Sequence, residues 1–242
     1  MKARYYEYSI QYKHRKYRIL TPQSLPDEMY LCCNYYKNSD SDYIDGDRYT
    51  FQSLRNAAVT LALIPDVAIF YPVGRRKSIY ILPNNEELAE SRGYDLVLYN
   101  HQIQLTLSDW KQMRKMLRYV KKKPFYLNFN IPDLLHKAQE RWKSYQKSKQ
   151  YYYSQSKSQV KFSSGTCFVE SNKILQLHAF LQLEEFLQND IENISREQKY
   201  STICFPYEGV ECGFVTRKDK KIWDDYWKSK FEKINGKKQE MI

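Results

Sequence analysis

The chain has 242 residues, of which 42% are hydrophobic, 16% aromatic and 28% charged, and this composition excludes a wholly disordered chain. No stretch approaches 18 uninterrupted apolar residues, so we expect no membrane-spanning helix. Lys and Arg number 39 against 28 Asp and Glu, which leaves a net charge of +11 and indicates a soluble, basic protein.

The first hundred residues favour strands over helices. Residues 3–20 are rich in Tyr and alternate in polarity, which predicts a strand with a basic end. Residues 50–63 carry apolar side chains at helical spacing and precede Pro65, so we expect a helix there. A turn at 74–76 between two apolar runs predicts a hairpin over 67–82. Further strands are predicted over 28–36, 94–100 and 102–107, and a loop over 38–47.

Helices dominate the second half of the sequence. Ser108 is a candidate N-cap for a helix over 109–122, and Pro132 suits the first turn of a helix over 133–149. Later elements are predicted as helices over 171–194 and 219–234 and strands over 200–206 and 210–216. Strands and helices do not alternate regularly, so we expect an α+β fold with mixed, mainly antiparallel strands and several amphipathic helices, one of them basic.

Three regions are expected along the chain. Residues 1–150 would form a Tyr-rich α+β region that ends in the basic helices. Residues 151–165 begin with a polar, low-complexity stretch and are predicted to be a mobile linker. Residues 166–242 would form a helix–strand–helix region that packs on the first as one globule.

The positive charge is concentrated in residues 111–161, which contain fourteen basic and only two acidic side chains. Concentrated cations are typical of polyanion-binding surfaces, although they also occur on solvated helices of Lys-rich proteins. The helix predicted over 109–122 gathers five of the cations on one side at spacings of three and four residues, without acidic partners at i+4. They are Lys111, Arg114, Lys115, Arg118 and Lys122.

These patterns predict a nucleic-acid-binding protein that contacts the phosphate backbone and has no catalysis of its own. Tyr rings beside cations also suit a single strand, because bases stack on rings while Lys and Arg hold phosphates. Besides the five helix cations, the predicted binding residues are Arg15, Lys16, Arg18, Arg75, Arg76, Lys77, Lys137, Arg141, Tyr151, Tyr152 and Tyr153.

A metal-dependent nuclease is the first alternative. Asp95, Asp109 and Lys111 have the spacing of two metal-holding carboxylates and a lysine that positions the attacking water, with Mg²⁺ as the cofactor. The Ser108–Asp109 pair is also explained as the start of a helix, where Asp suits the helix dipole.

A second alternative is an interaction module whose basic face docks an acidic protein partner within a larger complex. Under the main interpretation no metal or cofactor is expected, because the sequence lacks paired metal-ligand motifs and glycine-rich nucleotide loops. The five Cys residues have no disulfide-framework spacing, and the first twenty residues have no apolar signal core. We therefore expect a cytoplasmic protein.

Overall fold

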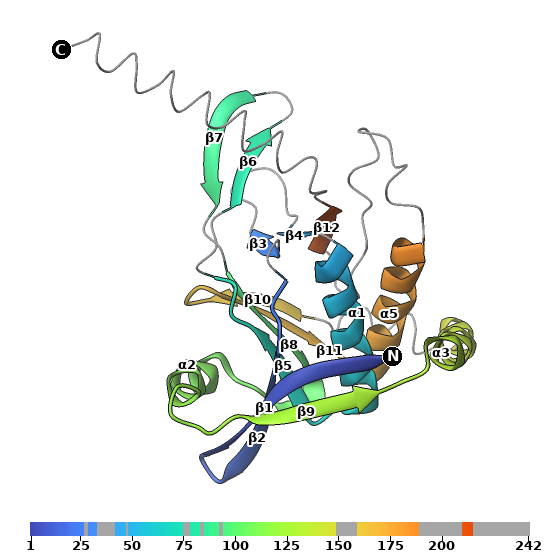
Figure 1. The fold of residues 1–242 in the computed structure, drawn as a ribbon, viewed down its shortest axis with the longest axis horizontal. Helices are drawn as coiled ribbons and strands as arrows, with labels where there is room; N and C mark the ends of the chain where they lie inside the picture. The colour runs from blue at the N-terminus through green and yellow to red at the C-terminus, as the bar shows by residue number, and fades with distance from the viewer. Residues whose placement is uncertain are drawn as a thin grey trace, which may run out of the picture.

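A mixed seven-stranded sheet forms the centre of the computed structural model (Figure 1). The structure describes residues 1–26, 29–32, 42–46, 48–74, 78–82, 85–91, 94–148, 159–188 and 210–214. The strand order in the sheet is β10-β11-β8-β5-β2-β1-β9. Their bounds are β1 (Lys2–Tyr12), β2 (Arg15–Pro22), β5 (Val67–Tyr71), β8 (Asp95–Asn100), β9 (Lys123–Asn128), β10 (Gln159–Ser163) and β11 (Thr166–Ser171).

Most neighbouring strands of this sheet are antiparallel, and the β2–β5 and β8–β11 pairs are parallel. The parallel register aligns Thr166 with Asp95, so the first residues of β11 and β8 lie at the same edge of the sheet. With helices at irregular intervals along the chain, this arrangement confirms the predicted α+β class.

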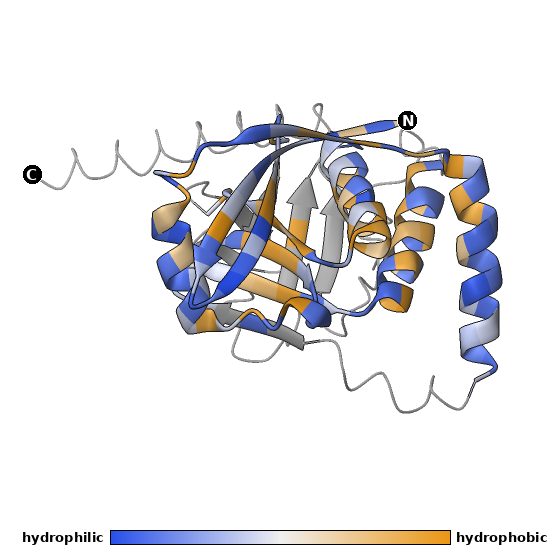
Figure 2. Cartoon of the chain, turned by 90° about the horizontal axis from the view of Figure 1, so that it is seen from below, coloured by the Kyte–Doolittle hydropathy of each residue, from blue (hydrophilic) through white to orange (hydrophobic). Residues whose placement is uncertain are grey.

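Helices cover both faces of the sheet (Figures 1 and 2). Helices α1 and α5 lie on one face, and α3 packs against the outer side of α5. Helix α2 lies on the opposite face. The helix bounds are α1 (Arg48–Leu63), α2 (Leu107–Met116), α3 (Ile131–Gln146) and α5 (Lys173–Gln188), and a short 3-10 helix, η1, covers His101–Ile103.

Two apolar clusters result from the alternation of side chains along the strands. Ile69 and Tyr71 of β5 face the cluster that contains α1 and α5. Ala68 and Phe70 of the same strand face the second cluster, where they meet Trp110 of α2. The central strands are buried on both faces, which explains why β5 and β8 are continuous apolar runs.

Two small sheets contain strand pairings that differ from those predicted from the sequence. The predicted hairpin over 67–82 is wrong, because β6 (Ser78–Leu82) pairs with β7 (Asn85–Ser91) while β5 joins the large sheet. The loop predicted over 38–47 contains a strand, β4 (Asp42–Gly46), which lies between β3 (Tyr30–Cys32) and β12 (Val210–Phe214). Ile44 of β4 is buried in the core, which explains why this polar segment is extended.

The second half of the chain contains further corrections. The strand predicted over 102–107 is instead η1 followed by the start of α2. Helix α2 ends at Met116, before residue 122, and residues 123–128 form β9, which pairs with β1. The linker predicted over 151–165 does not extend beyond residue 158, because 159–163 form β10. The strand predicted over 200–206 and the helix predicted over 219–234 lie outside the described residues. Among the described helices, none is long and apolar enough to cross a membrane.

Two contacts between helices involve buried or partly buried titratable side chains. Arg55 of α1 donates a hydrogen bond to Glu184 of α5 at 2.8 Å, and both side chains are almost fully buried. His178 of α5 stacks on Trp142 of α3, with ring centroids 3.8 Å apart and ring planes 9° apart. Burial of this imidazole lowers the pKa of His178 from 6.5 to about 4.

The His178 pKa predicts a loss of stability in mild acid. Between pH 6.5 and about 4 the unfolded chain binds a proton at this residue and the folded chain does not, so the free energy of unfolding falls through this window and then levels off. His178→Phe keeps a stacked ring without a titrating group. Urea unfolding at pH 7 and pH 4.5 should show wild type losing more stability than the variant. Equal losses of unfolding free energy in the wild type and the variant would contradict a lowered pKa at His178.

Candidate anion-binding site

Helix α2 begins after a side-chain N-cap. The residues that it buries determine where its basic side chains lie. The Thr106 hydroxyl accepts a hydrogen bond from the Asp109 amide at 3.1 Å, so Thr106 is the N-cap in place of the predicted Ser108. Trp110 and Met113 are buried against the sheet. This orientation leaves the cations of α2 at the margin of the helix–sheet contact.

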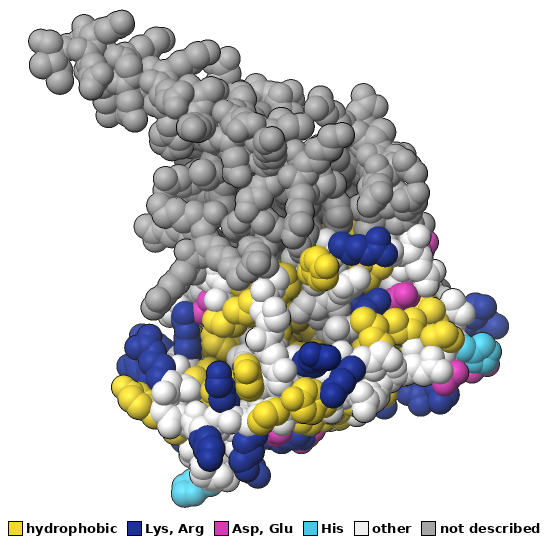
Figure 3. Space-filling view, viewed as in Figure 1, with side chains coloured by type: hydrophobic (Ala, Val, Ile, Leu, Met, Phe, Trp, Pro, Cys, Tyr) yellow, Lys and Arg dark blue, Asp and Glu magenta, His cyan; other side chains and the backbone are white. Residues whose placement is uncertain are grey.

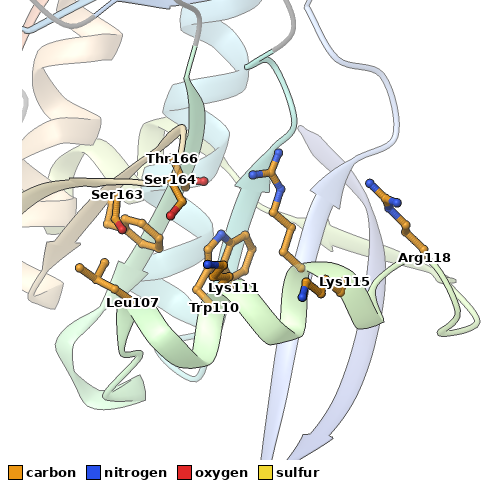
Figure 4. Close-up of a pocket in the computed structure, with 10 residues that line it drawn as sticks. Leu107, Trp110, Lys111, Lys115, Arg118, Ser163, Ser164 and Thr166 are labelled. Carbon is orange, nitrogen blue, oxygen red and sulfur yellow. The ribbon is translucent and has the colours of Figure 1, made fainter.

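A pocket of about 340 Å³ lies between α2 and the turn that joins β10 to β11 (Figure 4). Four of the predicted cations line it, together with three hydroxyl side chains of the β10–β11 hairpin. Among the described residues that line the pocket, none is acidic. We call this the basic pocket; its polar lining residues are Lys111, Arg114, Lys115, Arg118, Ser163, Ser164 and Thr166, and its apolar ones are Leu107, Trp110 and Phe168.

The turn opposite α2 has a defined backbone conformation. Ser164 and Gly165 both have positive φ, of 51° and 75°, as a two-residue type I′ hairpin turn requires. Ser163 and Thr166 are paired in the β10–β11 ladder on either side of the turn. Figure 4 shows Ser163, Ser164 and Thr166 grouped across the pocket from Lys111, Lys115 and Arg118.

Asp95, the first residue of the inner strand β8, contacts both walls of the pocket. Its side chain is only 4% exposed and forms an ion pair with Arg114 of α2. Its Oδ1 also accepts a hydrogen bond from the Gly74 amide at 2.7 Å, and its own amide donates to the Gly165 carbonyl at 2.9 Å. Asp95 therefore holds the Arg114 side chain, the end of β5 and the β10–β11 turn together.

Asp109 is compensated by a different cation. Lys13, in the β1–β2 turn, donates a hydrogen bond to Asp109 Oδ1 at 2.8 Å. This hydrogen bond, with a smaller contribution from the Thr106 hydroxyl at the side chain, lowers the pKa of Asp109 from its ordinary value and keeps the carboxylate charged. The two carboxylates of the nuclease alternative thus each contact their own basic side chain, and Lys111 lines the basic pocket. In the described part of the chain, no three His, Cys, Asp or Glu side chains are grouped to hold a metal ion.

A second basic surface lies on the outer side of β1 and β9, on the face of the sheet opposite α1. Lys122 Nζ lies 4.0 Å from the Tyr6 ring centroid, and Lys2 Nζ lies 4.0 Å from that of Tyr126. Arg4 is directly opposite Tyr126 in the strand register. We call these five residues the β1–β9 face. Figure 3 shows Lys and Arg side chains interleaved with apolar ones over the lower part of the described surface.

The other predicted binding residues are dispersed or already paired. Arg18 is paired with Glu7 and Asp66, at 2.6 and 2.9 Å. Arg15 donates to Gln104 Oε1 at 2.9 Å. Lys16 is exposed on β2. Lys137 and Arg141 are exposed on α3, on the other side of the sheet from α2, so the two helices do not form one basic face (Figure 2). The predicted residues 75–77 and 151–153 lie outside the described residues.

Sequence reasoning missed the hydroxyl side of the basic pocket. Ser163, Ser164 and Thr166 fall in or beside the segment that was predicted as a linker. A signal was present, because Ser164–Gly165 lies between two apolar alternating runs, which is typical of a tight hairpin. No protein-family model, curated protein or solved structure matches this chain.

Substitutions at Gly74 and Gly165 distinguish two reasons for which this site requires glycine, namely close packing at Gly74 and a positive φ at Gly165. A Cβ on residue 74 would lie 2.7 Å from the Asp95 amide nitrogen and 2.8 Å from its Oδ1. Gly74→Ala should therefore reduce the free energy of unfolding by about 1–3 kcal/mol and displace Asp95. Gly165→Ala meets no atom within 4 Å, but its positive φ should cost about 1 kcal/mol.

The Asn substitutions provide the control, because Asn tolerates positive φ but is as bulky as other residues at Cβ. Urea unfolding should find Gly165→Asn more stable than Gly165→Ala, and Gly74→Asn no more stable than Gly74→Ala. If Asn were more stable than Ala at residue 74 as well as at residue 165, backbone conformation and not close approach to Asp95 would explain the glycine at residue 74.

Proposed function

We propose that the chain binds nucleic acid, DNA or RNA, through phosphate contacts made by α2 and the β10–β11 turn, without catalysis of its own. An accessory role in a larger nucleoprotein complex suits this activity. The observation that carries the proposal is the basic pocket, where four cations converge with three hydroxyl groups and the described lining contains no carboxylate. Such a group of donors suits phosphate oxygens, which Lys and Arg bind in exchange for condensed counterions.

The distribution of acidic side chains also supports the proposal. Arg18, Lys13 and Arg55 each form ion pairs with carboxylates in the rest of the structure. Of the four pocket cations, Arg114 is paired with Asp95, and Lys111, Lys115 and Arg118 form no ion pair with any described residue. Lys111 and Lys115 lie four residues apart on α2, and like charges at this spacing destabilise a helix, so an anionic ligand would stabilise this arrangement.

The β1–β9 face extends the surface that a nucleic acid would contact. Residues 118–122 lead from the basic pocket to Lys122, which lies on the Tyr6 ring. Tyr126 is 50% exposed and has Lys2 on its ring and Arg4 opposite it in the register. The exposed Tyr126 ring and the half-buried Tyr6 ring, each beside a cation, would allow bases to stack while the backbone follows the positive charge.

A matched pair of double charge reversals tests this proposal. Lys111→Glu/Lys115→Glu on α2 and Lys137→Glu/Arg141→Glu on α3 both change exposed i,i+4 cations and alter the net charge equally. At about 100 mM salt the α2 variant should bind single-stranded DNA, RNA or duplex about 10- to 100-fold more weakly. Its slope of log K against log[salt] should fall by about two units, since each lost phosphate contact removes about one. The α3 variant should stay within about threefold of wild type.

Fluorescence anisotropy with labelled probes, with and without Mg²⁺, measures these outcomes and separates the alternatives. Equal weakening by both variants would mean that only net charge matters and would contradict the assignment to α2. Cleavage of the probe in Mg²⁺ that Asp95→Ala abolishes would favour the nuclease instead. No binding to any probe would leave α2 as a surface for an acidic protein.

A further inference from the structure

The basic pocket carries more positive charge than an internal phosphate of a nucleic acid can neutralise. A phosphodiester in a strand has one negative charge, whereas four cations line this pocket, and among the described residues only Arg114 of the four is paired with a carboxylate, that of Asp95. A phosphomonoester carries about −1.5 to −2 charges at pH 7 and presents three terminal oxygens. Because it has only one ester link, it can enter a recess that a doubly esterified backbone phosphate has to bridge.

A buried donor in the pocket also lacks an acceptor. Trp110 is 2% exposed and lines the basic pocket, and its indole Nε1–H has no hydrogen-bond partner within the described part of the chain. Figure 4 shows Trp110 projecting from α2 toward the side where Ser164 and Thr166 lie, with a ring nitrogen on that edge. A buried N–H without an acceptor is unfavourable, and a ligand oxygen in the pocket would satisfy it.

The Arg114 guanidinium is oriented before any ligand arrives. Its ion pair with the buried Asp95 holds one side of the group, while the side chain remains 43% exposed and lines the pocket. Arg is the side chain best suited to bind two oxygens of one phosphate, because its donors form a planar fork. The hydroxyl groups of Ser163, Ser164 and Thr166 supply further donors on the opposite side.

We propose that the basic pocket binds a terminal phosphomonoester dianion, with Arg114, the Trp110 indole N–H and the β10–β11 hydroxyl groups around its oxygens. This inference rests on the proposed nucleic-acid binding and names the part of the strand that the pocket takes. The end phosphate of a strand and a free nucleoside monophosphate share this chemistry. The remaining backbone of a bound strand would follow the β1–β9 face.

The direct test compares three oligonucleotides of one sequence, with a 5′-phosphate, a 3′-phosphate or neither. One phosphorylated strand should bind about tenfold or more tightly than the unphosphorylated strand, as one or two added charge-assisted hydrogen bonds imply. A nucleoside monophosphate that displaces it at similar concentrations would support the pocket and identify a free nucleotide as ligand. Displacement only by phosphorylated strands would identify the strand end.

A substitution in the turn provides a variant that leaves the core intact. Ser164 is exposed and has positive φ, a conformation that Asp and Asn both tolerate. Ser164→Asp places a negative charge at the pocket and should abolish the preference for the phosphorylated strand. Ser164→Asn has the same shape as the Asp variant, and because its side-chain amide can donate a hydrogen bond in place of the hydroxyl, it should retain most of the preference. Trp110→Phe should reduce the preference while circular dichroism stays unchanged.

The outcomes separate this inference from the function on which it rests. Equal affinity for the three strands, still lowered by Lys111→Glu/Lys115→Glu, would overturn the phosphomonoester site and leave nucleic-acid binding in place. Loss of the preference in Ser164→Asp and Ser164→Asn alike would also overturn it. Absence of binding to every strand would overturn both.

Discussion

The buried carboxylate of Asp95 is the constraint on which the pocket depends. A charged group in this position has to be compensated, and its two oxygens contact the Gly74 amide and the Arg114 guanidinium. Its backbone amide binds the Gly165 carbonyl in the β10–β11 turn. One residue at the start of β8 therefore positions α2 and the turn relative to each other. These two elements form the opposite walls of the pocket.

Selective use of carboxylates explains how a protein with 28 acidic residues keeps a strongly basic site. The described ion pairs place Glu7 and Asp66 on Arg18 and Glu184 on Arg55, so these cations contribute to the fold. Asp95 is the exception, because it contacts a cation of the pocket and is itself almost completely buried. Asp95 is paired with Arg114 but is not one of the residues that line the pocket. The exposed charge of α2 is thus available to an anion.

Periodicity in the sequence predicted the side chains that share a face, but not the position of each face in the molecule. Alternation and helical spacing correctly indicated the helix at 50–63 and the buried runs in β5 and β8. Of the five cations predicted on one helix, Lys111, Arg114 and Lys115 lie on α2, whereas Arg118 and Lys122 follow its end at Met116. The same spacing could not show that Lys137 and Arg141 lie across the sheet from α2, because the side on which a helix packs depends on contacts distant in sequence. The pairing of β6 with β7 depends on which partner strand is available, and local turn residues do not determine it.

The partners of the candidate residues were also beyond sequence reasoning. Asp95 and Arg114 are nineteen positions apart, and Lys13 and Asp109 are 96 apart, so no local pattern connects them. The polar composition before residue 159 hid β10, and with it the hydroxyl side of the pocket. The Ser164–Gly165 turn signal was readable and would have located this hairpin.

The indole N–H of Trp110 offers the most direct measurement of the central claim, that the basic pocket binds phosphate. The chain has four Trp residues, so a ¹H–¹⁵N correlation spectrum contains few indole signals, and Trp110→Phe assigns the relevant one. On titration with a 5′-phosphorylated or 3′-phosphorylated oligonucleotide, the Trp110 indole proton should show a saturable downfield shift. The indole of Trp142, on α3 across the sheet, should not move. Saturated binding with no change at Trp110, or with equal changes at both indoles, would contradict phosphate binding in the basic pocket.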